Sequence, residues 1–328
     1  MSPLVANASN DPQERALQLD EAVQWARSNT FAATQYPVGR LLELKGANSV
    51  AVVIPSREVA ATIDTVVASA VTLRDVGLVD EVIVVDADSQ DGSASVATAF
   101  GATVYQEQFL MPQYGPVLGK GDAMWRALSI IESTVVVFVD SDTHGFGDHF
   151  IRGLLGPLLE HDHLQLVKGA YRRPFATGEQ SIPDGGGRVS ELTARPLLNL
   201  YFPELAAFQQ PLSGELAARR QALEWIPFMA GYGIEIQMLI DMYRQFGLDS
   251  LAQSDLGERV NAHQSLADLG TMAFTVMRTI ASRSGFADIA TAADQYLGYR
   301  EGQLDRRASE MVERPPQLAL PGQASTDG

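Results

Sequence analysis

Short runs of apolar residues alternate with helix-like segments along the first half of the chain. Each run holds mainly β-branched or aromatic residues, which is typical of strands buried on both faces. The predicted strands are residues 50–54, 81–86, 102–105 and 135–139. The predicted helices between them are residues 60–73, 91–99 and 122–131. This alternation indicates an α/β fold with a doubly wound, mainly parallel sheet and helices on both faces.

Longer helical patterns follow residue 142 and also precede the first strand. Further helices are expected over residues 146–159, 189–200, 232–246 and 265–282, and strands over 164–168 and 251–260. Residues 211–215 look like a turn into another strand. The pattern over residues 14–28 predicts an amphipathic helix that covers the sheet or meets a partner chain.

The composition excludes several classes of protein. A formal charge of -16 in 328 residues argues against a general binder of nucleic acid or anionic membranes, so a phosphorylated ligand requires a local basic cluster. The absence of cysteine excludes disulfides, thiolate metal sites and a catalytic cysteine. The longest apolar runs are strand-sized, and the N-terminus has no apolar signal core. A cytoplasmic enzyme without nucleic-acid or membrane partners fits these features.

Two carboxylates stand where the strand over residues 135–139 stops. Asp140 and Asp142 are two residues apart, a spacing that points both side chains to one side of a strand. Open α/β sheets bind ligands at the carboxyl ends of their strands, and two acids there suit a hard divalent cation that in turn holds phosphate oxygens. The alternative is an ordinary exit from a strand, where Asp and Ser commonly cap the next helix.

Short polar residues gather at the other strand ends that would converge near this pair. The stretches concerned are Pro55-Ser56-Arg57-Glu58, Asp86-Ala87-Asp88-Ser89, Gly119-Lys120-Gly121 and Asp140-Ser141-Asp142. Short side chains and bare backbone suit the base, ribose and phosphates of a nucleotide. Asp86 is a candidate for hydrogen bonds to base or ribose, and Lys120 for phosphate. Each stretch taken singly is more often a plain turn, and Gly119-Lys120-Gly121 lacks the glycine spacing of a Walker loop.

A glycine-rich loop is the second candidate for ligand binding. Gly185, Gly186 and Gly187 precede Arg188 and a predicted helix, so backbone amides and an arginine could meet an anion there. The alternative is a flexible surface loop. Residues that could add positive charge are Lys168, Arg172, Arg173, Arg195 and Arg259. Among the five histidines, His263 is the best candidate for metal or substrate, since its spacing from Asn261 puts both on one strand face.

These residues, in this order, resemble the retaining glycosyltransferases of GT-A fold that make glucosyl-3-phosphoglycerate, together with their mannosyl relatives. The resemblance spans residues 50–279 and includes Val137-Phe138-Val139-Asp140-Ser141-Asp142. Its more specific stretches are Gly185-Gly186-Gly187-Arg188-Val189, Gln210-Pro211-Leu212-Ser213-Gly214-Glu215, Gly231-Tyr232-Gly233-Ile234-Glu235-Ile236 and Leu256-Gly257-Glu258-Arg259.

The resemblance implies a nucleotide-sugar donor, a divalent metal (Mg²⁺ or Mn²⁺), 3-phosphoglycerate as acceptor and a homodimer. Donor-binding residues are then Pro55, Ser56, Arg57, Glu58, Asp86, Ser89, Lys120, Asp140, Ser141 and Tyr232. Acceptor-binding residues are Gly187, Arg188, Val189, Ser190, Arg259 and His263. Asp142, Asn261 and His263 are the metal candidates, and Asp142, Glu235 and Lys120 the catalytic ones.

The same reading divides the chain into four regions. An N-terminal helical arm covers residues 1–46, a nucleotide-sugar-binding half 47–145 and an acceptor-binding half 146–300. Residues 301–328, rich in Pro, Gly and Ser near the end, are expected to be mostly disordered.

The chain departs from the family pattern at two positions. The family usually carries an acid that contacts the base where this chain has Val59, and Glu58 stands one place early. The family also has a metal-binding histidine where this chain has Asn261, with His263 two residues further on. Three alternatives stay open: Asn261 ligates the cation through its carbonyl, His263 substitutes from the same face, or the affinity for metal is reduced.

We therefore expect transfer of glucose from an NDP-glucose, such as UDP-glucose, to the 2-hydroxyl of 3-phosphoglycerate. The alternatives are a mannosyl-3-phosphoglycerate synthase that uses GDP-mannose, a non-catalytic nucleotide-sugar binding protein, and a nucleotidyltransferase that would release pyrophosphate.

Overall fold

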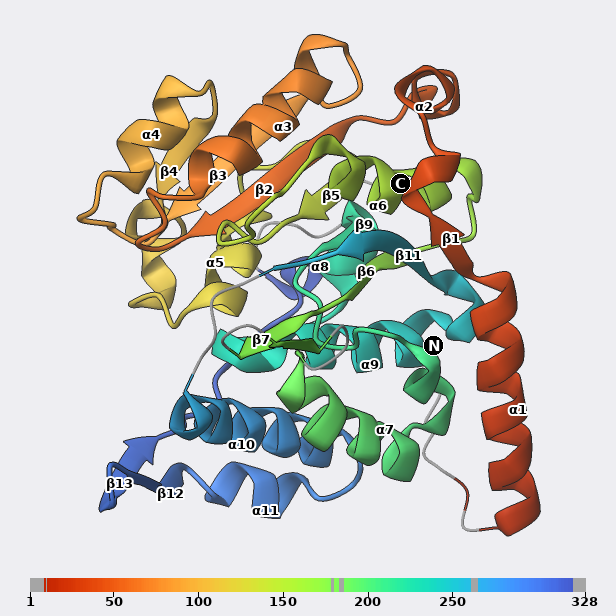
Figure 1. The fold of residues 1–328 in the computed structure, drawn as a ribbon, viewed down its shortest axis with the longest axis vertical. Helices are drawn as coiled ribbons and strands as arrows, with labels where there is room; N and C mark the ends of the chain where they lie inside the picture. The colour runs from red at the N-terminus through yellow and green to blue at the C-terminus, as the bar shows by residue number, and fades with distance from the viewer. Residues whose placement is uncertain (1–8, 10, 178–179, 183–185, 261–264, 321–328) are drawn as a thin grey trace.

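One mixed β-sheet forms the centre of the computed structural model, which describes residues 9, 11–177, 180–182, 186–260 and 265–320 (Figure 1). Its strand order is β1-β11-β6-β9-β5-β2-β3-β4. The strands are β1 Thr30–Ala32, β2 Val50–Ser56, β3 Glu81–Asp86, β4 Thr103–Gln106, β5 Val135–Phe138, β6 Leu166–Arg172, β9 Leu216–Arg219 and β11 Leu251–Glu258. β9 runs antiparallel to its neighbours β5 and β6, and the other pairs are parallel. The mainly parallel α/β sheet is therefore confirmed.

Helices cover both faces of this sheet (Figure 1). The helices are α1 Pro12–Ser28, α2 Val38–Lys45, α3 Ile63–Asp75, α4 Ser93–Ala99, α5 Lys120–Ala127, α6 Asp148–Glu160, α7 Arg195–Tyr201, α8 Arg220–Trp225, α9 Ile234–Phe246, α10 Leu266–Arg283 and α11 Ala287–Ala292. α2, α3, α4 and α6 lie on one side, and α5, α7, α9 and α10 on the other.

The alternation of side chains along β2 explains why the strand reads as uniformly apolar. Val50, Val52 and Ile54 join the core under α3 and α6, whereas Ala51 and Val53 join the core under α5 and α9. All five side chains are fully buried. A strand buried on both faces has no polar face to show in the sequence, which is the usual pattern of central parallel strands.

Smaller hairpins and turns complete the fold outside the sheet. They are β7 Phe175–Thr177 with β8 Gln180–Ile182, β10 Phe228–Met229 with β14 Glu313–Arg314, and β12 Gln295–Arg300 with β13 Gln303–Ala308. A π-helical turn, Ser190–Ala194, leads into α7 where one continuous helix was expected. No helix within the described ranges combines the length and apolar character needed to cross a bilayer.

The N-terminal arm adds a strand as well as the predicted helix. α1 packs against the turn at Pro203–Ala207, and β1 pairs in parallel with β11 at the sheet edge. Neither β1 nor α2 was predicted; a three-residue edge strand such as β1 carries little pattern of its own.

The end of the chain differs from expectation. The prediction of a mostly disordered segment is wrong for residues 301–320, which contain β13, β14 and a short 3₁₀ turn, Gln317–Ala319. Arg314 is buried and donates to the Asp122 carboxylate from Nε at 2.8 Å and from Nη2 at 2.7 Å. Trp125 donates from its indole nitrogen to the Pro315 carbonyl at 2.8 Å. Long-range contacts such as these thus order a segment whose composition alone predicts disorder. Residues 321–328 lie outside the described residues.

Candidate active site

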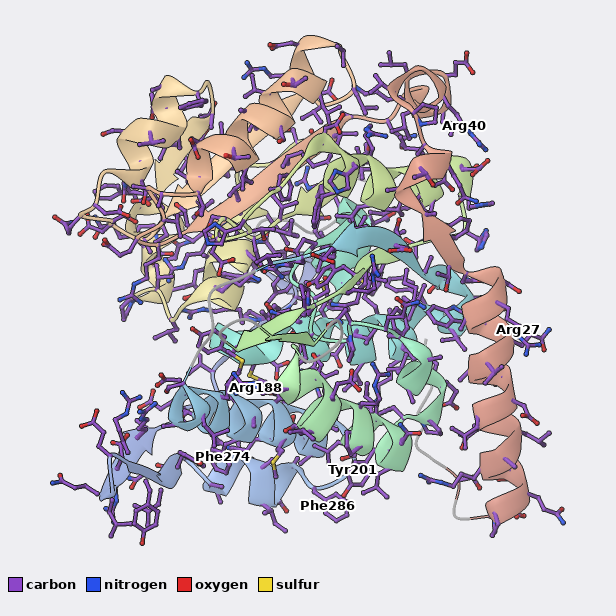
Figure 2. All side chains as sticks on the ribbon, viewed as in Figure 1. Arg27, Arg40, Arg188, Tyr201, Phe274 and Phe286 are labelled. Atoms are coloured by element: carbon purple, nitrogen blue, oxygen red, sulfur yellow. The ribbon has the colours of Figure 1, made fainter. Side chains whose placement is uncertain are left out.

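A cavity of about 720 Å³ opens at the carboxyl ends of β2 and β5. Its lining comes from loops that the sequence separates widely. They include the end of β2 with the loop after it (Pro55, Ser56, Arg57, Val59), the loop after β5 (Asp140, Ser141, Asp142), the start of α5 with the residue before it (Gly119, Lys120), the loop into the π-helical turn (Gly186, Gly187, Arg188, Val189, Ser190), the turn into α9 (Tyr232, Glu235) and Arg259. Arg188 lies between the β7 hairpin and α10 (Figure 2).

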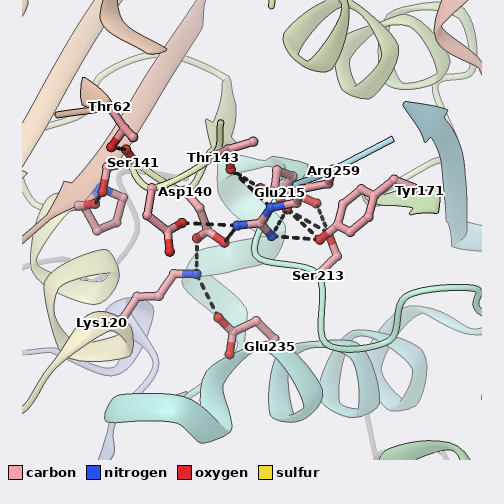
Figure 3. A network of polar contacts seen from close by, with 12 residues as sticks. Thr62, Lys120, Asp140, Ser141, Thr143, Tyr171, Ser213, Glu215, Glu235 and Arg259 are labelled. Carbon is pink, nitrogen blue, oxygen red and sulfur yellow. Dashed lines mark hydrogen bonds and ion pairs between the residues drawn. The ribbon is translucent and has the colours of Figure 1, made fainter. Parts of the chain in front are cut away.

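Lys120 lies between two carboxylates on the floor of this cavity (Figure 3). Its Nζ donates to Asp140 and, at 2.8 Å, to Oε1 of Glu235. Burial alone would lower the pKa of Lys120, but the two anions outweigh it and raise the pKa above its ordinary value. The ammonium therefore stays charged at every physiological pH.

Arg259 joins three carboxylates from two different segments, the loop after β5 and the residue before β9. Nη2 donates to Asp140 at 2.8 Å and to Asp142 at 3.3 Å, and Nη1 donates to Glu215 at 2.9 Å. Burial favours the neutral form of Asp140, yet Lys120 and Arg259 outweigh it and hold the pKa of that carboxyl well below its usual range. Asp140 is thus held ionised between two cations.

Buried polar side chains fix the orientation of the Arg259 guanidinium. Nε donates to Thr143 at 3.1 Å and Nη1 to the Tyr171 hydroxyl at 2.9 Å, and Tyr171 donates to Glu215 at 2.9 Å. Burial raises the pKa of Glu215 and raises the pKa of Tyr171 to about 12. Thr143, Tyr171 and Glu215 were not among the predicted site residues, although Glu215 lies in a stretch that carries the resemblance.

Asp142 presents its carboxylate to the cavity far more openly than Asp140 does. Its side chain is 62% exposed against 18% for Asp140. A carboxylate is a hard oxygen ligand of the kind that Mg²⁺ and Mn²⁺ prefer. Asp142 therefore fits a divalent cation, whereas both oxygens of Asp140 are engaged by Lys120 and Arg259. Asn261 and His263, the other metal candidates, lie outside the described residues.

Three predicted donor-binding residues lie outside the cavity lining and support it instead. Asp86 is fully buried, and its carboxylate accepts from Ser56 Oγ at 2.9 Å and Ser89 Oγ at 2.7 Å. The backbone N–H of Glu58 donates to Ser89 at 3.0 Å, and the Glu58 carboxylate accepts from the Gln90 N–H at 2.9 Å. Asp86, Ser89 and Glu58 thus hold Ser56 and the loop after β2, and their direct contact with a ligand stays a prediction.

In the glycine loop, Gly186 and Gly187 line the cavity with backbone and no side chain. Gly187 has φ of +67°, a left-handed conformation that favours glycine. At Gly186 an added Cβ would lie 2.7 Å from the carbonyl oxygen of Arg173, so no larger residue fits. Ser190 is almost fully buried at the start of the following turn. The Gly186 N–H donates to the Arg173 carbonyl at 2.9 Å, and Gly186, Gly187, Arg188 and Arg173 all line the cavity.

The other basic candidates serve the structure or lie elsewhere. Lys168 is fully buried, donates to the Ser213 carbonyl at 2.9 Å, and has its pKa lowered to about 8 by burial. Arg195 pairs with Glu191 and donates to the carbonyl of Ala206. Arg172 is exposed outside the cavity lining. Of the five candidates for positive charge, Arg173 and Arg259 line the cavity.

The chain is similar to known proteins along most of its length. The profile described as Glycosyl transferase family 2 matches residues 51–205. Glucosyl-3-phosphoglycerate synthase of Mycobacterium tuberculosis strain H37Rv is 41% identical over 298 residues, which cover 89% of this chain and 92% of that protein. The synthase of the same name from Mycolicibacterium smegmatis is 38% identical over 298 residues, with 90% and 98% covered.

Solved structures are also similar along most of the chain. Mannosyl-3-phosphoglycerate synthase from Rubrobacter xylanophilus superposes with a TM-score of 0.83 at 42% identity, covering 91% of this chain and 98% of that one. Glucosyl-3-phosphoglycerate synthase from Mycobacterium tuberculosis, in complex with Mn²⁺, UDP-glucose and phosphoglyceric acid, gives 0.78 at 40% identity, covering 86% and 94%.

The fold and the site define the chain as a glycosyltransferase of GT-A fold. It belongs to the family of glucosyl-3-phosphoglycerate synthases and their mannosyl counterpart.

Proposed function

We propose that the protein transfers glucose from a nucleoside diphosphate glucose to the 2-hydroxyl of 3-phosphoglycerate, with retention at the anomeric carbon. The observation that carries this proposal is the continuity of one cavity. It joins Asp142 and Lys120, which suit a diphosphate, to the loop of Gly187 and Arg188, which suits a small phosphorylated acid. The family's glucosyl-3-phosphoglycerate synthase of Mycobacterium tuberculosis, solved with UDP-glucose and phosphoglyceric acid, supports the substrate assignment.

Asp142 would hold the divalent metal, together with Asn261 or His263 and oxygens of the donor diphosphate. When bound, the metal would neutralise charge on the departing diphosphate as a Lewis acid. The Mn²⁺ complexes of the Mycobacterium tuberculosis synthase support this assignment. Asp140 acts differently: it orients Lys120 and Arg259 and stays ionised between them.

Lys120 supplies fixed positive charge to the leaving group. Because Asp140 and Glu235 hold its ammonium in place before the donor binds, little reorganisation accompanies the build-up of negative charge. The anionic acceptor, which carries a phosphate and a carboxylate, meets Arg188, Arg173 and the N–H groups around Gly187. These contacts hold its 2-hydroxyl against the sugar.

No protein nucleophile is required by this arrangement. We infer front-face attack by the acceptor hydroxyl, with its proton passing to an oxygen of the leaving diphosphate. Glu235 would accept a hydrogen bond from a sugar hydroxyl and so orient the donor, since its carboxylate lines the cavity beside Tyr232.

A donor panel tests the function. Purified protein is incubated with 3-phosphoglycerate, Mg²⁺ or Mn²⁺, and UDP-, ADP- or GDP-glucose or GDP-mannose, while release of the nucleoside diphosphate is followed. Turnover with a glucose donor is expected. Turnover with GDP-mannose alone would make the protein a mannosyl-3-phosphoglycerate synthase, the second candidate, which the similarity to the Rubrobacter xylanophilus enzyme favours. Pyrophosphate release would indicate a nucleotidyltransferase, and binding without turnover a non-catalytic protein.

Two variants separate the roles of the carboxylates. Asp142→Ala is expected to lose about a hundredfold or more in kcat, because the metal loses its cavity ligand. Glu235→Ala is expected to lower kcat as well, and full kcat in that variant would remove Glu235 from the mechanism. Glu43→Ala, an exposed carboxylate on α2, is the matched control and should keep wild-type kinetics.

A further inference from the structure

The end of the cavity away from the glycine loop carries a carboxylate that the mechanism does not use. Glu107 follows β4 directly and lines the cavity with Arg57, Val59, Ala87 and Val117. The other acids in the described lining, Asp140, Asp142 and Glu235, belong to the diphosphate and sugar region. Glu107 therefore marks a separate part of the site.

The order of the strands places Glu107 at the distance of a nucleoside from the diphosphate region. β4 is separated from β5 by β2 and β3, so three strand spacings of about 4.8 Å put the two strand ends roughly 14 Å apart. The glycine loop, proposed to take the acceptor, lies against Arg173 just after β6, and β6 is on the other side of β5 from β4. A donor whose diphosphate meets Asp142 and Lys120 must then extend its nucleoside toward Glu107.

The Glu107 carboxylate has unused hydrogen-bonding capacity. Within the ranges that the structure describes, no side-chain or backbone donor hydrogen-bonds to it, and it forms no ion pair. Glu58, the nearest alternative acid in sequence to the base-contacting position, is turned away and accepts from the Gln90 N–H at 2.9 Å. Partial burial removes water from this carboxylate without giving it a hydrogen-bond donor in exchange. A donor group on a bound ligand would supply that hydrogen bond.

We propose that Glu107 recognises the base of the nucleotide donor. Its carboxylate would accept a hydrogen bond from the ring N–H on the Watson–Crick edge of that base. This inference rests on the proposed function, since it assumes a nucleoside diphosphate sugar as ligand. Uracil carries such a group at N3 and guanine at N1, whereas a base methylated there lacks the donor and adds bulk. A site built around a substrate N–H rejects the analogue without it, because a buried polar group is left unpaired.

This assignment is tested without turnover by calorimetry, in which each nucleotide is titrated into the full-length protein in the presence of Mg²⁺. UDP is compared with 3-methyl-UDP, and GDP with 1-methyl-GDP; the pair with the larger difference identifies the base. The wild type is expected to bind the parent nucleotide at least about tenfold more tightly than its methylated form. Glu107→Ala should reduce that ratio to near one, and Glu107→Gln, which keeps an acceptor oxygen, should retain a preference for the parent.

Glu132→Ala removes an exposed carboxylate outside the cavity and should keep the wild-type ratio. An unchanged ratio in Glu107→Ala would overturn the assignment. A wild type that binds none of the four nucleotides would overturn it together with the proposed donor. A wild type that discriminates through Glu107 but transfers no sugar would uphold the assignment and overturn the proposed function.

Discussion

At the scale of single residues, the site depends on close packing around Asp140 and Lys120. Gly214 precedes β9, and a Cβ added there would collide with the Asp140 carboxylate and the Lys120 ammonium. We expect Gly214→Ala to displace this ion pair and to lower kcat by about a hundredfold, because misplaced charges lose their preorganisation. Steady-state kinetics measure the loss.

A second alanine substitution controls for the general effect of replacing glycine. Gly39 lies in α2, and a Cβ there would meet no atom within 4 Å. Gly39→Ala should keep wild-type kcat. Equal activity of Gly214→Ala and Gly39→Ala would show that the pair tolerates displacement.

The pKa of Glu107 makes stability depend on pH. Burial and then the nearby Asp122 raise the pKa of this carboxyl to about 7, with Asp86 adding to the shift and Arg126 and Arg57 opposing it. The folded state therefore holds the proton more tightly than the unfolded chain, whose glutamate titrates near 4.5. Stability that is fully present below pH 4.5 is lost as pH rises to about 7.

Glu107→Gln should remove this dependence, because the amide carries no charge to desolvate. We expect the variant to gain about 1 kcal/mol of unfolding free energy at pH 8, after a discount for partial exposure, and almost nothing at pH 5. Urea denaturation at the two pH values measures the difference. An equal gain at both would assign the effect to packing.

At the scale of elements, the C-terminal strand β14 supports the helix that carries Lys120. Arg314 pairs with Asp122, whose carboxylate also accepts from the Leu118 N–H at 3.0 Å and pairs with Arg126 in the same helix. Arg314→Met leaves a buried carboxylate with one cation in place of two. We expect a loss of about 3 kcal/mol in unfolding free energy and a lower kcat, measured by denaturation and kinetics.

Arg306→Met supplies the control for Arg314→Met, since Arg306 is an exposed arginine of β13. It should leave both quantities unchanged. If Arg314→Met matched this control, the C-terminal strand would have no part in holding α5.

The helices and strands also explain which residues of this site could be predicted from the sequence. Both Asp140 and Lys120 stand beside buried elements with clear patterns, so their convergence at one sheet edge was predictable. Glu215 and Thr143 belong to the site because Arg259, which follows β11, donates to both, and the sequence does not show these contacts. Asp86 shows the converse: the sequence places an acid at a strand end, but it does not reveal that its carboxylate accepts hydrogen bonds from Ser56 and Ser89.

At the scale of the whole molecule, two apolar cores on either side of one sheet stabilise the fold. The division of the chain at residues 47, 146 and 301 stays a prediction, because this sheet contains strands from both proposed halves. The homodimer also stays a prediction.

Since the two cores consist of apolar side chains and Asp142 lies in the cavity, removal of the cation should affect chemistry and leave folding intact. We expect EDTA to abolish turnover, Mn²⁺ or Mg²⁺ to restore it, and the melting temperature to change by no more than about 2 °C. Thermal denaturation followed by circular dichroism, with and without EDTA, measures the second quantity. A large fall in melting temperature would mean that the metal is structural.

The central claim is retaining glucosyl transfer to the 2-hydroxyl of 3-phosphoglycerate. Proton and carbon NMR of the product from UDP-glucose, 3-phosphoglycerate and Mn²⁺ tests it most directly. The account predicts a single product in which an α-configured anomeric carbon is bonded to the C2 oxygen of the glycerate. A β-linked product, attachment at another oxygen, or release of free glucose alone would contradict it.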